Sequence, residues 1–242
     1  MPDAHYTDPR LAQLYDADCG RNADSMFYLS LAGQTPIHIL DLGCGTGWLC
    51  NAYADLSHAV TGVDPANAML DVARTKTHGK AITWVADSAQ TFRSPQRFDL
   101  IVMTGHAFQT LVTDADIAAA LITMRHHLAP GGTIVFETRN PNRGWASRWN
   151  GVSRDQQLDG QRVRQTYEIL SGTANTITFA THYAFSNAIL TSTSTLLFMT
   201  HNELALLFLA NGLHLRTVFG AWDKTPFDSE TSDEMIFVLG AI

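Results

Sequence analysis

The chain has 242 residues, which is long enough to bury one substantial hydrophobic core, and no Pro-, Ser- or Gly-rich linker divides it. Its formal net charge is −7. The basic residues form no dense block, and we expect arginines such as Arg139, Arg148 and Arg154 to be solvated. Nucleic acid is therefore not an expected partner, because phosphate backbones are bound by concentrated basic surfaces. We expect residues 1–242 to form one domain.

The cysteines and the apolar runs bear on the cellular compartment. Three cysteines, Cys19, Cys44 and Cys50, form neither a Cys-x-x-Cys pair nor an even-numbered disulfide framework, so a reduced, cytoplasmic protein is expected. The longest apolar runs are shorter than the roughly 18 residues of a membrane span, and no membrane association is expected.

The first segment with a helical pattern covers residues 8–32. Aromatic and apolar side chains recur there at spacings that suit helices. We expect a helical cap at residues 1–35, which either packs on a sheet or covers a ligand site.

A glycine-rich loop follows this cap. Gly43, Gly45 and Gly47 come after an apolar run at residues 37–40 and before a segment at residues 48–56 that can be helical. Glycines at a strand-to-helix turn let the backbone approach a nucleotide-type ligand closely. The dinucleotide fingerprint G-x-G-x-x-G asks for a small residue where this chain has Trp48, so a pyrophosphate is not the expected ligand.

Strand and helix patterns then alternate along the chain. Strands are expected near residues 37, 59, 81, 98 and 132, and helices near residues 48, 66, 88 and 115. This alternation is typical of a parallel sheet with helices on both faces, an α/β fold. Right-handed crossovers place the loops that follow the strands at one edge of the sheet, where we expect the ligand site.

The pattern changes after the fifth strand. Residues 141–160 are polar, and three antiparallel strands are expected at residues 163–170, 176–185 and 191–199. A helix at residues 202–210 and two strands at 213–221 and 234–239 follow, which makes seven strands in the main sheet. The insertion at residues 142–200 can serve as a lid, or it can pair its edges with a second subunit in a homodimer.

Five motifs in this order, spread over residues 37–140, resemble those of the class I S-adenosylmethionine-dependent methyltransferases. They are the glycine loop, Asp64 after the second strand, Asp87-Ser88 after the third, Thr104-Gly105-His106 after the fourth, and Pro130-Gly131-Gly132 before the fifth. The resemblance implies a Rossmann-like seven-stranded sheet in the order 3-2-1-4-5-7-6 with the last strand antiparallel. It also implies S-adenosylmethionine as cofactor and a small-molecule methyl acceptor.

The resemblance assigns cofactor contacts residue by residue. The ribose hydroxyls are expected to contact Asp64, and the methionine amino group is expected to contact the Thr104 carbonyl. The methionine and ribose portion is expected to lie against the loop residues Asp41, Gly43, Cys44, Gly45 and Gly47. The adenine is expected to lie against Pro65, Met69, Asp87 and Ser88. For Asp87, capping of a helix is the alternative. For Cys44, a small side chain in a crowded turn is expected rather than a reactive thiol.

Catalytic assignments are fewer. His106 is a candidate general base, because it follows the fourth strand at the ligand-binding edge; the alternative is that it only shapes the pocket. Tyr15 is a candidate for a tyrosine near the sulfonium. Glu137, at the end of the fifth strand, can contact an amine or bond the chain. No carboxylate cluster follows the fourth strand, so no metal is expected.

The sequence therefore predicts methyl transfer from S-adenosylmethionine to an O or N atom of a small acceptor. Two alternatives stay open at this stage. One is a non-catalytic S-adenosylmethionine-binding protein, and the other is a nicotinamide-dependent oxidoreductase, which shares the logic of the glycine loop.

Overall fold

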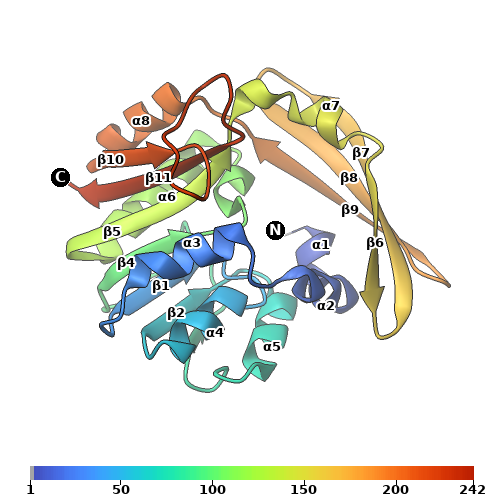
Figure 1. The fold of residues 1–242 in the computed structure, drawn as a ribbon, viewed down its shortest axis with the longest axis horizontal. Coiled ribbons are helices and arrows are strands. Elements are labelled where there is room, and N and C mark those ends of the chain that lie inside the picture. Colours follow the sequence, from blue (N-terminus) through green and yellow to red (C-terminus); the bar gives the residue numbers. More distant parts are fainter. Residues whose placement is uncertain (1–2) are drawn as a thin grey trace.

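A seven-stranded sheet forms the centre of the protein, whose computed structural model describes residues 3–242 (Figure 1). The strand order is β10-β11-β5-β4-β1-β2-β3. Six of the strands run in the same direction, and β11 runs antiparallel to its neighbours β5 and β10. The strands are β1 (His38–Leu42), β2 (Ala59–Val63), β3 (Thr83–Val85), β4 (Phe98–Met103), β5 (Leu128–Arg139), β10 (Leu213–Phe219) and β11 (Glu234–Ala241). The predicted order 3-2-1-4-5-7-6 is confirmed.

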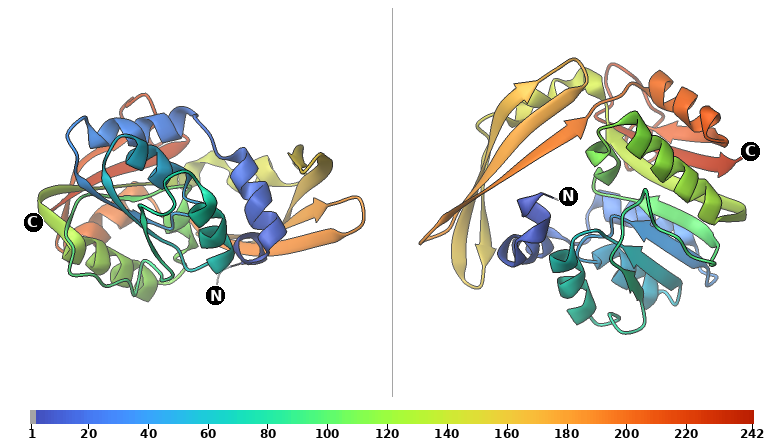
Figure 2. Two further views of the ribbon diagram at one scale, coloured as in Figure 1. Left: turned by 90° about the horizontal axis from the view of Figure 1, so that it is seen from below. Right: turned by 180° about the vertical axis from the view of Figure 1, so that it is seen from behind.

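Helices cover both faces of this sheet, and alternate residues of each strand point to opposite faces. Leu40 and Ile101 pack on one side, with α6 (Asp114–His127) and α8 (His201–Ala210). Ile39 and Leu100 pack on the other side, with α3 (Ala23–Ala32) and α4 (Trp48–Asp55). Figure 2 shows α3 and α6 on opposite faces. None of the helices within residues 3–242 combines the length and the apolar character that crossing a membrane requires.

The connection between β3 and β4 differs from the prediction. A helix was expected near residue 88, but the chain makes a single turn there and then runs without regular structure to β4. The Asp87 carboxylate accepts hydrogen bonds from the backbone N–H of Ser88 and the hydroxyl of Thr91. Such local bonds compete with helix propagation, and Pro95 follows shortly after.

The start of β5 also differs from the prediction. The strand begins at Leu128, ahead of the expected residue 132, and its register with β4 shifts between Phe98 and Leu100. Gly131, with φ +79°, lies in this irregular stretch. The expected tight turn is therefore built into the strand as a bulge.

A second, antiparallel sheet is inserted after β5, as predicted, but it has four strands rather than three. They are β6 (Ser153–Leu158), β7 (Gln161–Gly172), β8 (Thr176–Ala184) and β9 (Ile189–Leu197). The additional strand, β6, is polar and lacks the alternation that marks a half-buried strand. Asp159 and Gly160, both at positive φ, form its turn to β7, and this Asp-Gly pair is the hairpin signal that the prediction overlooked.

Two N-terminal helices, α1 (Ala4–Thr7) and α2 (Pro9–Asp18), lie between the two sheets (Figure 1). The backbone N–H of His5 donates to the Ser192 hydroxyl at 2.8 Å. At the other side, Ala12 packs with Ala66 and Met69, next to α5 (Asn67–Thr75). The N-terminal helices therefore join the second sheet to the edge of the central one.

The contact between Gly62 and Trp84 gives a test of the packing. A Cβ on Gly62 would lie 2.5 Å from the Trp84 ring, which is fixed by a 2.8 Å hydrogen bond from its indole N–H to the Gly79 carbonyl. We expect Gly62→Ala to lower the free energy of unfolding by about 1–3 kcal/mol, measured in urea. Gly172→Ala is the control, because its Cβ would meet only an ordinary 3.6 Å contact. Equal stability of the two variants would contradict this packing.

Candidate active site

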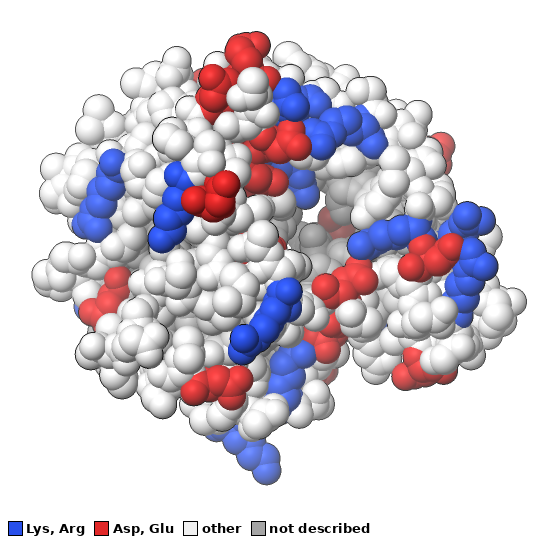
Figure 3. Space-filling model, in the orientation of Figure 1, with Lys and Arg blue, Asp and Glu red and all other residues white. Residues whose placement is uncertain are grey.

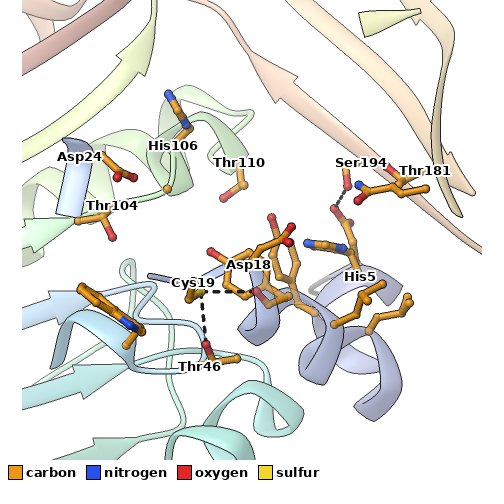
Figure 4. A pocket seen from close by; sticks show the side chains of 18 of the residues that line it. His5, Asp18, Cys19, Asp24, Thr46, Thr104, His106, Thr110, Thr181 and Ser194 are labelled. Atoms are coloured by element: carbon orange, nitrogen blue, oxygen red, sulfur yellow. Dashed lines mark hydrogen bonds between the residues drawn. The ribbon is translucent and has the colours of Figure 1, made fainter. Parts of the chain in front are cut away.

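A cavity of about 450 Å³ lies between the carboxyl edge of the central sheet, the N-terminal helices and the second sheet. Figure 3 shows the surface hollowed between these parts, with acidic and basic side chains at the rim. Figure 4 shows Thr104 and His106 across the cavity from Thr181 and Ser194. The wall thus combines residues from the central and the inserted sheets.

The glycine loop is tied to the end of β2. The N–H groups of Gly43 and Cys44 donate to the Val63 carbonyl at 2.7 and 3.1 Å. Asp64 accepts the Gly45 N–H at 2.9 Å on one carboxylate oxygen and the Ala66 N–H at 2.8 Å on the other. Burial raises the pKa of Asp64, and these two amide bonds oppose that rise. Each oxygen keeps capacity to accept a further hydrogen bond, which a ribose hydroxyl can supply.

Asp41, at the end of β1, borders the cavity and is 1% exposed. One carboxylate oxygen accepts the Cys50 thiol at 3.3 Å, and the other has no hydrogen-bond partner among the described residues. Burial raises the pKa of Asp41 to about 7. An orphaned, buried carboxylate oxygen beside the glycine loop suits a ligand that brings a cationic amine or another hydrogen-bond donor.

His106 lies in a left-handed conformation, with φ +59°, at the start of the short helix η1 (Ala107–Thr110). Its backbone N–H donates to Glu137 at 2.7 Å, and Nε2 lies 2.8 Å from a Glu234 oxygen. Its Nδ1 is 3.9 Å from the Glu137 carboxylate. Because a carboxylate accepts hydrogen bonds, Glu234 favours the tautomer with the proton on Nε2.

Glu137 links this histidine to the opposite face of the sheet. It is 1% exposed and also accepts the hydroxyl of Tyr28, on α3. Burial raises the pKa of Glu137, while His106 and Tyr28 act to lower it. Of the two roles considered for Glu137, the structure places it in bonds to the chain.

Tyr15 lies across the glycine loop. Its ring is 3.5 Å from the position of a Cβ on Gly45, and its hydroxyl is 3.5 Å from that of a Cβ on Gly105. Burial raises its pKa well above 10.0, so the phenol is neutral. Tyr6 and Tyr15 pack with Met69, so the N-terminal helices cover the place expected for adenosine.

The structure therefore divides the predicted site residues into two groups. Those on the cavity wall are Tyr15, Asp41, Cys44, Thr104 and His106. Those outside the wall are Gly43, Gly45, Gly47, Asp64, Pro65, Met69, Asp87 and Ser88. In the second group, the three glycines form the loop itself, Asp64 bonds its backbone, Met69 packs with Tyr6 and Tyr15, and Asp87 bonds its own turn.

Arg139 is a cavity residue that the sequence analysis placed in solvent. This expectation is wrong: the guanidinium lies over the Trp149 ring at 5.0 Å, and burial lowers its pKa. A usable signal was present, because Arg139 ends β5 and the ends of parallel strands meet at the ligand-binding edge. Trp149, Tyr167 and Phe179 line the same part of the cavity.

Comparisons with known proteins agree with this geometry. Residues 39–132 match a family described as a methyltransferase domain. A ubiquinone biosynthesis O-methyltransferase of Bradyrhizobium sp. (strain ORS 278) is 32% identical over 155 residues, which cover 61% of this chain and 56% of the relative. The chain thus spans about half the length of that curated relative.

Solved structures of methyltransferases share the fold. The CcbJ methyltransferase from Streptomyces caelestis superposes with a TM-score of 0.79 at 21% identity, covering 98% of both chains. CalS10, an amino pentose methyltransferase from Micromonospora echinaspora, gives a TM-score of 0.68 at 23% identity, with 94% of both chains covered. Together, these results show a methyltransferase domain at residues 39–132 and the fold of S-adenosylmethionine-dependent methyltransferases across the chain. The CalS10 structure contains bound S-adenosylmethionine.

The raised pKa of Asp41 predicts a pH-dependent stability in the ligand-free protein. Between pH 3.8 and about 7 the folded state keeps a proton on Asp41 that the unfolded state releases, so this group destabilises the fold as pH rises through that range. We therefore compare the free energies of unfolding of Asp41→Asn and wild type. We expect the variant's value, relative to that of wild type, to rise by about 1–3 kcal/mol between about pH 4 and about pH 8.

Urea unfolding at the two pH values measures this difference. Asp71→Asn is the control, because the Asp71 side chain is 73% exposed. A difference between Asp41→Asn and wild type that does not change with pH would contradict the assignment.

Proposed function

We infer that the protein transfers a methyl group from S-adenosylmethionine to an O or N atom of a small acceptor bound in the 450 Å³ cavity. The observation that carries this proposal is the orphaned carboxylate oxygen of Asp41, buried at the cavity wall beside the glycine loop. The related proteins support it: one is a ubiquinone biosynthesis O-methyltransferase, and another acts on an amino pentose.

The residues present fit the cofactor. Asp41 offers a free acceptor to its methionine amino group, and Asp64 offers acceptors to its ribose hydroxyls. The cofactor supplies a methyl carbon bonded to a positively charged sulfur. The phenol face of Tyr15, next to the glycine loop, is suited to stabilise such a cation.

Tyr15 and the N-terminal helices have a second role in this proposal. They lie over the loop and the Met69 side, so they move aside for cofactor entry and close again behind it. Closure excludes water from an in-line displacement, in which alignment of the reactants supplies most of the rate.

The acceptor atom forms a bond to the methyl carbon, the electron pair of the carbon–sulfur bond remains on sulfur, and a proton leaves the acceptor. His106 is the proton acceptor in this proposal. Glu234 holds its Nε2, and no hydrogen bond within residues 3–242 occupies its Nδ1.

Cofactor binding tests the role of Asp64. We expect Asp64→Ala to weaken retention of labelled S-adenosylmethionine about tenfold or more, because it removes hydrogen bonds from a charged acceptor to both the ribose and the loop. Asp87→Asn is the comparison, since Asp87 bonds its own turn. Unchanged affinity in Asp64→Ala would make the assignment of Asp64 wrong. If the wild type binds S-adenosylmethionine but forms no labelled product with any acceptor, the protein is a cofactor-binding protein without methyltransferase activity.

Steady-state kinetics test His106. We expect His106→Asn to lower kcat about 100-fold, because a positioned general base contributes about that much. Glu234→Ala should also lower kcat, since it removes the hydrogen bond that orients the imidazole. An unchanged kcat with a raised KM in His106→Asn would show that the residue only shapes the pocket.

A further inference from the structure

Arg139 is held in the cavity wall by a neutral partner. Gln109, which is 1% exposed, accepts the backbone N–H of Arg139 at 3.3 Å and its Nη1 at 3.0 Å on the same amide oxygen. The Gln109 amide nitrogen donates to the Leu197 carbonyl at 2.9 Å, which fixes the orientation of the amide. Gln109 therefore positions the guanidinium without neutralising it.

The other arginines near this wall are paired, and Arg139 is not. Arg143 and Arg148 both contact Asp233, at 2.7 and 2.9 Å, and Arg154 contacts Asp18 at 2.7 Å. Within residues 3–242, no carboxylate lies within 4.0 Å of the Arg139 guanidinium. Arg139 is partly buried, and the Glu234 and Glu137 carboxylates act on it only from beyond contact distance. Because no counter-charge contacts the guanidinium, an anionic ligand relieves part of its desolvation cost.

The surroundings of Arg139 define the rest of such a ligand. The guanidinium stacks over Trp149, whose ring centre is 5.5 Å from that of Phe179. Tyr167 adds a third ring, 6.0 Å from Phe179. This part of the cavity thus offers flat apolar walls around one fixed positive charge, which suits a small molecule with an apolar body and an anionic end.

Arg139 also lies away from the cofactor loop. It ends β5, which is separated by β4 from β1 and its glycine loop. Its aromatic neighbours come from α7 (Trp145–Trp149) and from the inserted strands β7 and β8. The position is therefore on the acceptor side of the cavity.

We propose that the methyl acceptor carries an anionic group, a carboxylate or a phosphate, that Arg139 binds with its guanidinium fork while Gln109 holds that fork in place. The proposal rests on the proposed function, because it assigns the anion to the acceptor. It defines the acceptor class as a small amino or hydroxy compound with an acidic group and an apolar portion.

Tryptophan fluorescence provides the test, since Trp149 stacks on Arg139. The probes are benzoate, phenyl phosphate and the neutral isostere benzamide, titrated into the full chain. We expect Arg139→Gln to weaken binding of the preferred anion about tenfold or more, and to leave benzamide binding unchanged. Preference for benzoate or for phenyl phosphate in the wild type distinguishes the two anions.

Arg148→Gln is the matched control. It removes a guanidinium that also stacks on a tryptophan, 4.2 Å from the Trp145 ring, but that pairs with Asp233. It should change anion affinity less than about twofold. Two further variants, Arg139→Lys and Gln109→Leu, keep a positive charge at the site and serve where Arg139→Gln folds poorly. If they bind the anion more weakly than wild type while their circular dichroism is normal, the result supports binding by the guanidinium fork and its positioning by Gln109.

The outcomes separate this proposal from the proposed function. Binding of the anion that depends on Arg139 and persists with saturating S-adenosylhomocysteine supports it. The anion proposal is overturned if Arg139→Gln and Arg148→Gln bind the anion equally, or if the wild type does not bind it. Either result leaves the proposal of methyl transfer intact, because cofactor binding tests that proposal separately. Competition between anion and S-adenosylhomocysteine would assign Arg139 to the cofactor carboxylate instead. If S-adenosylhomocysteine does not bind at all, the proposed function is wrong, and the anion site does not serve a methyl acceptor.

Discussion

The connection between the ends of β1 and β2 is the constraint on which the site depends. The Val63 carbonyl accepts two N–H groups of the glycine loop, and the Asp64 carboxylate accepts a third, from Gly45. These bonds hold the loop open at the carboxyl edge of the sheet, where it starts α4. Asp41 is buried behind the loop with one oxygen unpaired among the described residues. The rigid edge is thus prepared for a ligand that completes its hydrogen bonds.

The rest of the cavity is closed by polar contacts between segments far apart in the sequence. His5 bonds Ser192 through its backbone and Tyr183 through its ring, and Asp18 bonds Arg154. These contacts tie the N-terminal helices to the inserted sheet, so the two covers of the cavity act as one unit. A buried apolar cluster of Leu11, Leu14, Val163 and Tyr183 strengthens this connection.

The sequence predicted the central sheet well because long periodic patterns determine it. Gly43, Gly45 and Gly47 have φ values of +73°, +53° and +70°, which explains why the loop motif was readable. The inserted strand β6 and the position of Arg139 were missed, since both depend on tertiary contacts that periodicity does not encode. The resemblance, rather than a local pattern, suggested Tyr15 as a cover of the cofactor loop, because its contact with Gly45 depends on how α2 packs between the sheets.

Calorimetric titration of the purified protein with S-adenosylmethionine, and separately with NAD, tests the central claim most directly. The account predicts binding of S-adenosylmethionine at about micromolar concentration and no heat with NAD, because Trp48 stands where a dinucleotide loop needs a small residue. Titration at several temperatures guards against a binding enthalpy near zero. Binding of NAD together with no response to S-adenosylmethionine at any temperature would contradict the assigned cofactor site.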